Sequence, residues 1–187
     1  TEIYTLSLHD ALPISDQIKL GKAKVALAVG TESMSRNPVA AYTHRAGFRM
    51  GQVDFRDFLW EATKDTSFGG SMGDTAENLA KRYGISREEV DRFAELSFSR
   101  AVAGWESGYF DGEVSAVVNS KWDLEGYNSR SLKLADRAER CERDGHVRAT
   151  SFETLQKLKA AFGGVQTGGN SSAIVDGAAA VLVASGD

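Results

Sequence analysis

The 187-residue sequence contains one cysteine, two prolines and three histidines, and each shortage excludes a class of structure. A single cysteine excludes an intramolecular disulfide framework. The histidines, His9, His44 and His146, stand far apart in the sequence and lack the spacing of metal ligands. With two prolines against 19 glycines, the turns must be made mostly by Gly, Asn, Asp and Ser.

Long apolar runs and an excess of positive charge are also missing. No apolar run approaches the ~18 residues that a membrane span requires. The formal net charge of −4 provides no basic surface for a nucleic acid. Hydrophobic residues make up 42% and charged residues 26%, which is typical of a globular protein that buries its own core. We therefore expect a soluble, cytoplasmic protein that binds neither nucleic acid nor membrane.

The first 15 residues, TEIYTLSLHDALPIS, differ in character from the rest. They lack the basic start of a secretory signal, and His9-Asp10 interrupts their apolar run. One interpretation is a short strand followed by a turn at Pro13. The stretch also resembles the translated sequencing-adapter tails found at the ends of assembled reads. On that resemblance we expect residues 1–15 to be non-native and the genuine chain to begin mid-gene near Asp16.

Small and β-branched residues dominate residues 24–30, a pattern typical of a strand buried on both faces of a sheet. The segment before it, 16–22, indicates the end of a helix with Gly21 as its C-cap. Residues 37–70 carry no sustained period, and such a long irregular segment is usually functional or an insertion. Near the C-terminus, residues 176–184 fit either a strand or the start of a small-residue helix.

Helical spacing is clear in two segments, residues 72–83 and residues 86–107. In the first, one face carries Ala76, Leu79, Ala80 and Tyr83, and in the second, helical spacing is held by Val90, Phe93, Ala94, Ser97, Ala101 and Trp105. A capping box of Ser86 and Glu89 begins the second helix. A similar box, Thr150 to Glu153, predicts a short helix through Leu158. Between the two boxes we expect a strand over 113–119 and a charged, solvated face over 120–145.

Four segments, in order, resemble the thiolase family, the enzymes that make or cleave 3-ketoacyl-CoA. They are DQIKLGKAK with the following strand and GTESMSR, MGDTAENLA with YGISREEVD, LQKLKAAF, and TGGNSSAIVDGAAA. Their order and spacing match over residues 16–187. The resemblance implies an α/β fold of two similar halves in αβαβα layers, with an α+β loop domain inserted in the first half. It assigns residues 16–36 to the N-terminal core, 37–165 to the loop domain and 166–187 to the return into the core.

The family's catalysis uses a nucleophilic Cys, a His that activates it, and a second Cys that moves a proton, with oxyanion holes made by an Asn–water pair and backbone N–H groups. By resemblance the nucleophile would precede Asp16 and the others would follow Asp187. We therefore expect no catalytic residue in this chain and no activity of the chain alone. Cys141 matches neither cysteine motif of the family and is interpreted as a partly exposed structural thiol.

The resemblance also implies recognition of coenzyme A, which is a substrate here, with no resident cofactor and no metal. Ser172 matches the serine that contacts the pantetheine arm. Gly168 matches the small residue whose backbone lies against that arm, where a side chain would obstruct the tunnel. In an alternative interpretation, Asn170 and Ser172 only form a turn.

Four further positions match the family's substrate contacts. Arg148 matches a basic residue near the nucleotide end and Thr154 a hydroxyl that serves it, while Phe162 and Met72 match apolar groups along the pantetheine and acyl path. Alternatively, Arg148 is solvated and Thr154 bonds only within its own helix. Phe162 is expected in the core under either interpretation.

Two departures bear on the substrate. Ser71 stands where many short-chain biosynthetic members have His, which weakens the case for acetoacetyl-CoA as the preferred substrate. Residues 41–70 are rich in large apolar side chains, namely Phe48, Phe55, Phe58, Leu59, Trp60 and Phe68. This group would line a tunnel for medium or long acyl chains, form an interface, or make the loop's own small core.

Three functions follow from these observations. The first is a piece of an acyltransferase that condenses acetyl-CoA or thiolyses 3-ketoacyl-CoA, and whose full-length form is a homodimer or homotetramer. The second is a non-catalytic thiolase-like protein that binds acyl-CoA or lipid. The third is a self-sufficient α/β binding domain unrelated to thiolases.

Overall fold

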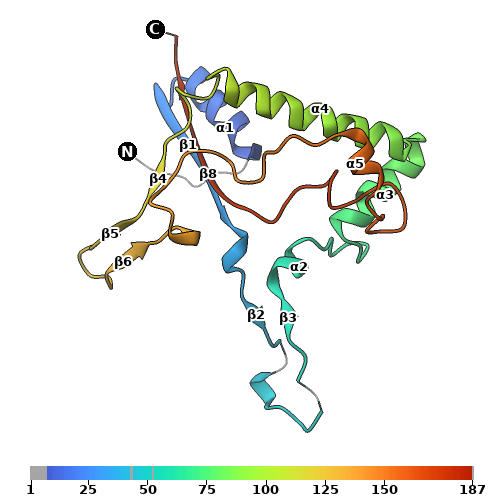
Figure 1. Ribbon diagram of the computed structural model, residues 1–187. Coiled ribbons are helices and arrows are strands. Elements are labelled where there is room, and N and C mark those ends of the chain that lie inside the picture. The colour runs from blue at the N-terminus through green and yellow to red at the C-terminus, as the bar shows by residue number, and fades with distance from the viewer. Residues whose placement is uncertain (1–7, 43, 52, 187) are drawn as a thin grey trace. The chain divides into compact units, whose positions relative to one another are not determined.

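The computed structural model describes residues 8–42, 44–51 and 53–186, and these residues form two compact units (Figure 1). Unit 1 holds the described residues up to Ser71 and those from Ile174 onward, and unit 2 holds Met72–Ala173. Within the described part of the chain, no helix combines the length and apolar character that a membrane crossing requires.

Unit 1 begins with helix α1, Leu8–Lys19, which contains Pro13. The first part of the predicted non-native tail, residues 1–7, lies outside the described residues. The rest of that tail is helical, so a strand with a turn at Pro13 is wrong for the described residues. The predicted C-cap is confirmed: Gly21 has a φ of +70°, and the N–H of Lys22 donates to the carbonyl of Gln17 at 2.9 Å.

Strand β1, Val25–Ser33, pairs antiparallel with strand β8, Asp176–Ala184, from Val25 opposite Ala184 to Ser33 opposite Asp176 (Figure 1). Both segments are therefore strands, and the helical alternative for 176–184 is wrong. The expected burial of 24–30 on both faces is wrong too, because Val25 is 57% exposed and Leu27 47%. The physical reason is that β1 and β8 form a two-stranded sheet in the described residues.

The irregular segment between β1 and unit 2 contains short elements only. They are η1 Met34–Arg36, β2 Val39–Ala40, η2 His44–Ala46, β3 Arg56–Asp57 and α2 Phe58–Ala62, with β2 and β3 paired antiparallel. Its aromatic side chains do not form a small core, because Phe55, Trp60 and Phe68 are each half exposed or more. A tunnel wall and an interface remain as predictions for this group.

Unit 2 is built on helices α3, Met72–Tyr83, and α4, Arg87–Glu106. The capping box is confirmed: the Ser86 hydroxyl accepts the Glu89 N–H at 3.2 Å, and the Ser86 N–H donates to the Glu89 carboxylate at 2.7 Å. These bonds from the Ser86 backbone and side chain lower the pKa of Glu89.

The remaining elements of unit 2 are short. They are β4 Val117–Val118 paired with β7 Arg140–Cys141, β5 Ser120–Trp122 paired with β6 Arg130–Leu132, η3 Ala135–Arg137 and α5 Phe152–Gln156. The strand predicted over 113–119 is therefore only two residues long. The second capping box is wrong, because Ser151 caps α5 by accepting the Thr154 N–H at 3.3 Å, and the helix ends before Leu158. Cys141 is exposed, as expected.

The core of unit 2 lies where α3, α4 and α5 meet the loop that precedes β8. Its buried apolar residues are Ala80, Ala94 and Leu155, accompanied by buried Asp91 and Thr167. The predicted helix faces are partly wrong: Tyr83 is 66% exposed and Phe93 70%. The inner faces carry the carboxylates of Glu77 and Asp91 beside Ala80 and Ala94, and both carboxylates accept hydrogen bonds from the loop.

Candidate functional site

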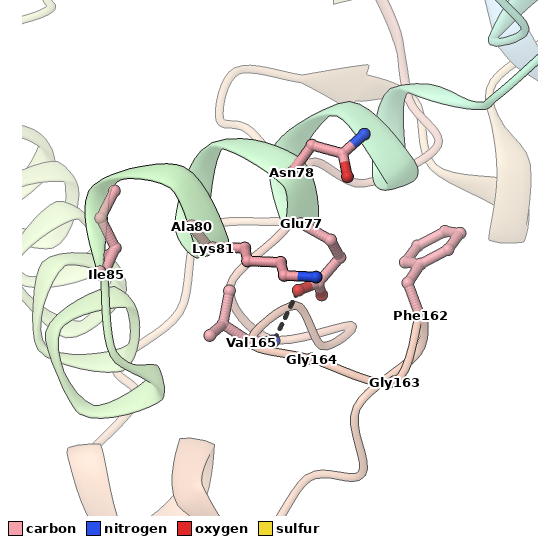
Figure 2. Close-up of a pocket in the computed structure, with 10 residues that line it drawn as sticks. Glu77, Asn78, Ala80, Lys81, Ile85, Phe162, Gly163, Gly164 and Val165 are labelled. Atoms are coloured by element: carbon pink, nitrogen blue, oxygen red, sulfur yellow. Dashed lines mark hydrogen bonds between the residues drawn. The ribbon is translucent and has the colours of Figure 1, made fainter. Parts of the chain in front are cut away.

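The loop over residues 163–172 is held on one side by the carboxylate of Glu77, which α3 presents (Figure 2). The N–H groups of Val165 and Gln166 donate to its two oxygens, each at 2.9 Å. Partial burial raises the pKa of Glu77, but these bonds outweigh it and hold the pKa below its ordinary value. Gly164 lies so close to this carboxylate that a Cβ there would collide with it.

The other side of the loop is held by Asp91, which is fully buried on α4. One carboxylate oxygen accepts the Arg87 Nε–H at 2.7 Å, and the other accepts the Asn170 side-chain amide at 2.8 Å. The Asn170 side-chain oxygen accepts the Thr167 N–H at 2.7 Å, which closes the turn. Asn170 is therefore the link between the loop and α4, besides being a turn former.

These bonds leave Gly168 and Ser172 facing outward, and both are exposed. A Cβ at Gly168 would meet nothing within 4 Å. At the neighbouring Gly169 a Cβ would lie 2.5 Å from Leu158 and 2.6 Å from Leu155. Gly169 thus packs the loop onto α5, while the preceding Gly168 presents bare backbone to open space.

Arg148 lies in the segment before α5 and Thr154 lies within α5, and both are exposed. The Arg148 guanidinium lies over the ring of Phe98, with its Cζ atom 5.7 Å from the ring centroid. The hydroxyl of Thr154 lies 3.1 Å from that of Ser151, in the first turn of its own helix. This contact is what the alternative interpretation of Thr154 predicts.

Phe162 and Met72 are not core residues, since their side chains are 40% and 63% exposed. The Phe162 ring lies where a Cβ of Gly73 would be, next to Met72 at the start of α3. On its open side the ring helps to line a cavity of about 530 Å³ with Glu77, Lys81 and Val165 (Figure 2). Of the six predicted substrate contacts, this cavity contains Phe162 alone.

The sequence pattern that defines the family "Thiolase, N-terminal domain" matches residues 7–187. The chain belongs to the thiolase family. Among curated relatives, the mitochondrial 3-ketoacyl-CoA thiolase of Mus musculus is 38% identical over 169 residues, which are 88% of this chain and 39% of the relative. The acetyl-CoA acetyltransferase of Pseudomonas aeruginosa is 39% identical over 177 residues, which are 90% of this chain and 41% of the relative.

The structure is similar to solved thiolases as well. It matches the crystal structure of human mitochondrial 3-ketoacyl-CoA thiolase in complex with CoA with a TM-score of 0.77 and 34% identity, covering 95% of this chain and 42% of that one. The chain therefore has part of the α/β thiolase fold. It spans about two fifths of the length of the curated relatives it matches.

These findings confirm the resemblance and show that the hypothesis of an unrelated binding domain is wrong. The match to the thiolase family begins at residue 7, inside the stretch predicted to be non-native. The domain bounds at 37 and 165, the six substrate contacts and the position of the catalytic residues stay predictions. Among the described residues, no three His, Cys, Asp or Glu side chains are grouped as a metal site would require.

The two carboxylates that hold the loop over residues 163–172 are not identified in the sequence analysis. The sequence predictions select the apolar positions of α3 and α4 and give no role to Glu77 or Asp91. The available signal was the spacing of small residues: Gly73 and Ala80 place Glu77 between them on one face, and Ala94 lies one turn after Asp91. Small residues on a helix face allow a backbone to approach closely.

Proposed function

We propose that this chain is part of an enzyme that transfers acyl groups between coenzyme A thioesters, by condensation of acetyl-CoA or thiolysis of 3-ketoacyl-CoA. The chain supplies contacts for coenzyme A and the acyl group. The nucleophilic Cys, the His and the second Cys belong to the full-length protein outside this chain. That protein is a cytoplasmic homodimer or homotetramer, and it uses coenzyme A as substrate without a resident cofactor. The names of the relatives and the CoA-bound human structure support this proposal.

The observation that carries the proposal is the way the loop over 163–172 is anchored. The partly buried carboxylate of Glu77 and the buried carboxylate of Asp91 hold its inner side, and Gly169 packs against α5. Gly168 and Ser172 are left exposed, with open space beside the Gly168 backbone. A narrow pantetheine arm needs a fixed surface of bare backbone with a hydroxyl at hand, because a surface ordered in advance lowers the entropy cost of binding.

The other predicted contacts have the chemistry that the rest of the ligand requires. Arg148 offers an exposed guanidinium for a phosphate at the nucleotide end, and Thr154 a hydroxyl nearby in sequence. Phe162 and Met72 offer exposed apolar surface for the pantetheine and acyl path. Exposed aromatic residues such as Phe55 and Trp60 offer apolar surface either to an acyl chain longer than acetoacetyl or to an interface.

The test uses the full-length protein that contains this chain. Gly168→Val should weaken coenzyme A binding roughly tenfold or more, measured by isothermal titration calorimetry, because the side chain fills the space that the arm occupies. Gly112→Val is the matched control, since Gly112 also has open space at its Cβ position and no positive φ. Equal binding by the two variants contradicts the role of Gly168.

Activity separates the enzyme from the non-catalytic alternative. The full-length protein should thiolyse acetoacetyl-CoA or a longer 3-ketoacyl-CoA, and the 187-residue chain alone should not. Binding of coenzyme A without thiolysis by the full-length protein would identify a thiolase-like acyl-CoA-binding protein. A full-length protein that neither binds nor reacts would overturn the proposal.

A further inference from the structure

One face of α4 holds the segment over residues 146–154 in place. Arg92, Glu95 and Phe98 are spaced three residues apart, so they follow one side of the helix. The Arg92 guanidinium lies 4.2 Å from the Phe152 ring centroid, and the Glu95 carboxylate accepts the Phe152 N–H at 2.9 Å. These two contacts fix the entry into α5.

The third contact on this face is made by Phe98, and it involves Arg148 directly. The Arg148 guanidinium carbon lies 5.7 Å from the Phe98 ring centroid, within the range of a cation–π interaction. The His146 ring packs on the same phenyl ring, with the two centroids 5.7 Å apart and a tilt of 51°. Arg148 Nη1 also donates to the His146 carbonyl at 3.4 Å. The phenyl ring is thus the common support of both residues.

Arg148 is available for a ligand in this arrangement. Its side chain is exposed, and none of the ion pairs between described residues includes it. A free arginine samples many rotamers and loses that freedom when it grips an anion. An aromatic ring beneath the guanidinium limits those rotamers before the anion arrives, and therefore reduces the loss.

We propose that Phe98 is a positioning residue for the nucleotide end of the coenzyme A thioester. It holds the Arg148 guanidinium ready for a phosphate of that nucleotide, without touching the ligand itself. This inference rests on the proposed function, because it takes Arg148 to be the nucleotide contact. If it holds, substitution of Phe98 should change the affinity only for ligands that carry the nucleotide, and only while Arg148 is present.

The experiment measures binding by the full-length protein with two probes, coenzyme A and pantetheine, which lacks the nucleotide. Phe98→Leu should weaken binding of coenzyme A about two- to fivefold, the size expected for one exposed cation–π contact. Binding of pantetheine should not change, and the KM for the CoA thioester should rise while kcat stays constant. Phe98→Tyr keeps the ring face and should restore the wild-type values.

Two controls separate positioning from general damage. Phe93→Leu makes the same change at an exposed site of the same helix and should alter neither probe's affinity. In an Arg148→Ala background, Phe98→Leu should have no further effect, because the two substitutions remove one interaction.

Other results would contradict either the positioning role of Phe98 or the proposed function itself. If Phe98→Leu weakens both probes equally, or neither, the positioning role is wrong while the proposed function stands. The role is wrong in the same way if the effects of Phe98→Leu and Arg148→Ala simply add. If the wild-type protein binds no coenzyme A, the proposed function itself fails and the inference fails with it.

Discussion

At the scale of single residues, the loop that carries Gly168 and Ser172 depends on two acidic side chains from two helices. Glu77 is a partly buried carboxylate that accepts two backbone N–H groups, whereas Asp91 is fully buried and accepts one guanidinium and one amide. Asp91 does not line the cavity that contains Phe162, and Glu77, which does line it, uses both carboxylate oxygens to hold the loop. Both belong to the support of the site, so their substitution should alter stability first and binding second.

Asp91→Ala should lower the free energy of unfolding by about 1–3 kcal/mol, because it removes the buried acceptor shared by Arg87 and Asn170, which keep only their bonds to backbone carbonyls. Urea denaturation followed by circular dichroism measures the loss, because the signal of unit 2 comes mainly from α3 with 12 residues and α4 with 20. The matched control is Glu88→Ala, which removes an exposed partner of Arg92 on the same helix and should cost less than about 0.5 kcal/mol. Similar losses in the two variants would contradict the importance of burial at Asp91.

Glu77 should make unit 2 sensitive to acid. A carboxyl whose pKa is lower in the folded than in the unfolded state contributes stability above its unfolded pKa, about 4.3 for glutamate. That contribution is lost as the pH falls through the folded pKa, and the pKa of Glu77 is lowered by its bonds to Gln166 and Val165. The free energy of unfolding should therefore fall less steeply below pH ~4.3 in Glu77→Gln than in the wild type. A Glu77→Gln slope as steep as that of the wild type would show that Glu77 does not contribute to the acid sensitivity.

At the scale of elements, the start of α4 rests on a local motif that works independently of the loop. The Ser86 hydroxyl accepts the Glu89 N–H, one of the N–H groups that the first helical turn leaves without a partner. Ser86→Ala should therefore destabilise unit 2 by about 1 kcal/mol in urea denaturation. Ser97→Ala, an exposed change in the middle of the same helix, should cost nothing, because alanine is the better helix former there. Equal effects of the two substitutions would show that the cap is not used.

Elements that are determined by residues close together in the sequence could be predicted, and strand pairs whose members lie far apart in the sequence could not. The cap at Ser86, the end of α1 at Gly21 and the run 24–30 are defined by neighbouring residues, and the structure confirms each as a cap or a strand. The short pair of β4 and β7 joins Val117 to Cys141, and no local pattern encodes such a distant partner.

The residues of the candidate site also fall into a predictable and an unpredictable group. The resemblance could indicate Gly168 and Ser172, because the glycine-rich turn is formed by consecutive residues. It could not indicate Asp91, which is separated from Asn170 by 79 positions, nor Phe98, whose contact with Arg148 exists only after α4 and the segment before α5 have packed. The spacing of small residues marks a helix face that another segment approaches closely, but it does not identify Asn170 or Arg148 as the partner, so these contacts had to come from the structure.

At the scale of the whole chain, apolar burial is unevenly divided between the two units. Among the described residues, the buried apolar side chains of unit 2 are Ala80, Ala94 and Leu155, and Asp91 and Thr167 of this unit are fully buried as well. In unit 1, Ile14 is the buried apolar residue of the described part, while β1 and β8 keep Leu27 and Leu182 exposed. The two units should therefore differ in local stability.

Hydrogen exchange measured by mass spectrometry on the 187-residue chain should show this difference. Amides of α3 and α4 should be the slower to exchange, because buried side chains and two anchored carboxylates resist opening. Amides of β1 and β8 should exchange faster, since a two-stranded ladder with half-exposed side chains is marginally stable in water. Heating should accordingly give a broad transition instead of a single sharp one, because the units open separately. This prediction would be wrong if the amides of both units exchanged equally slowly and the chain unfolded in one sharp thermal transition. That result would mean that β1 and β8 are stabilised by contacts beyond those of their own side chains.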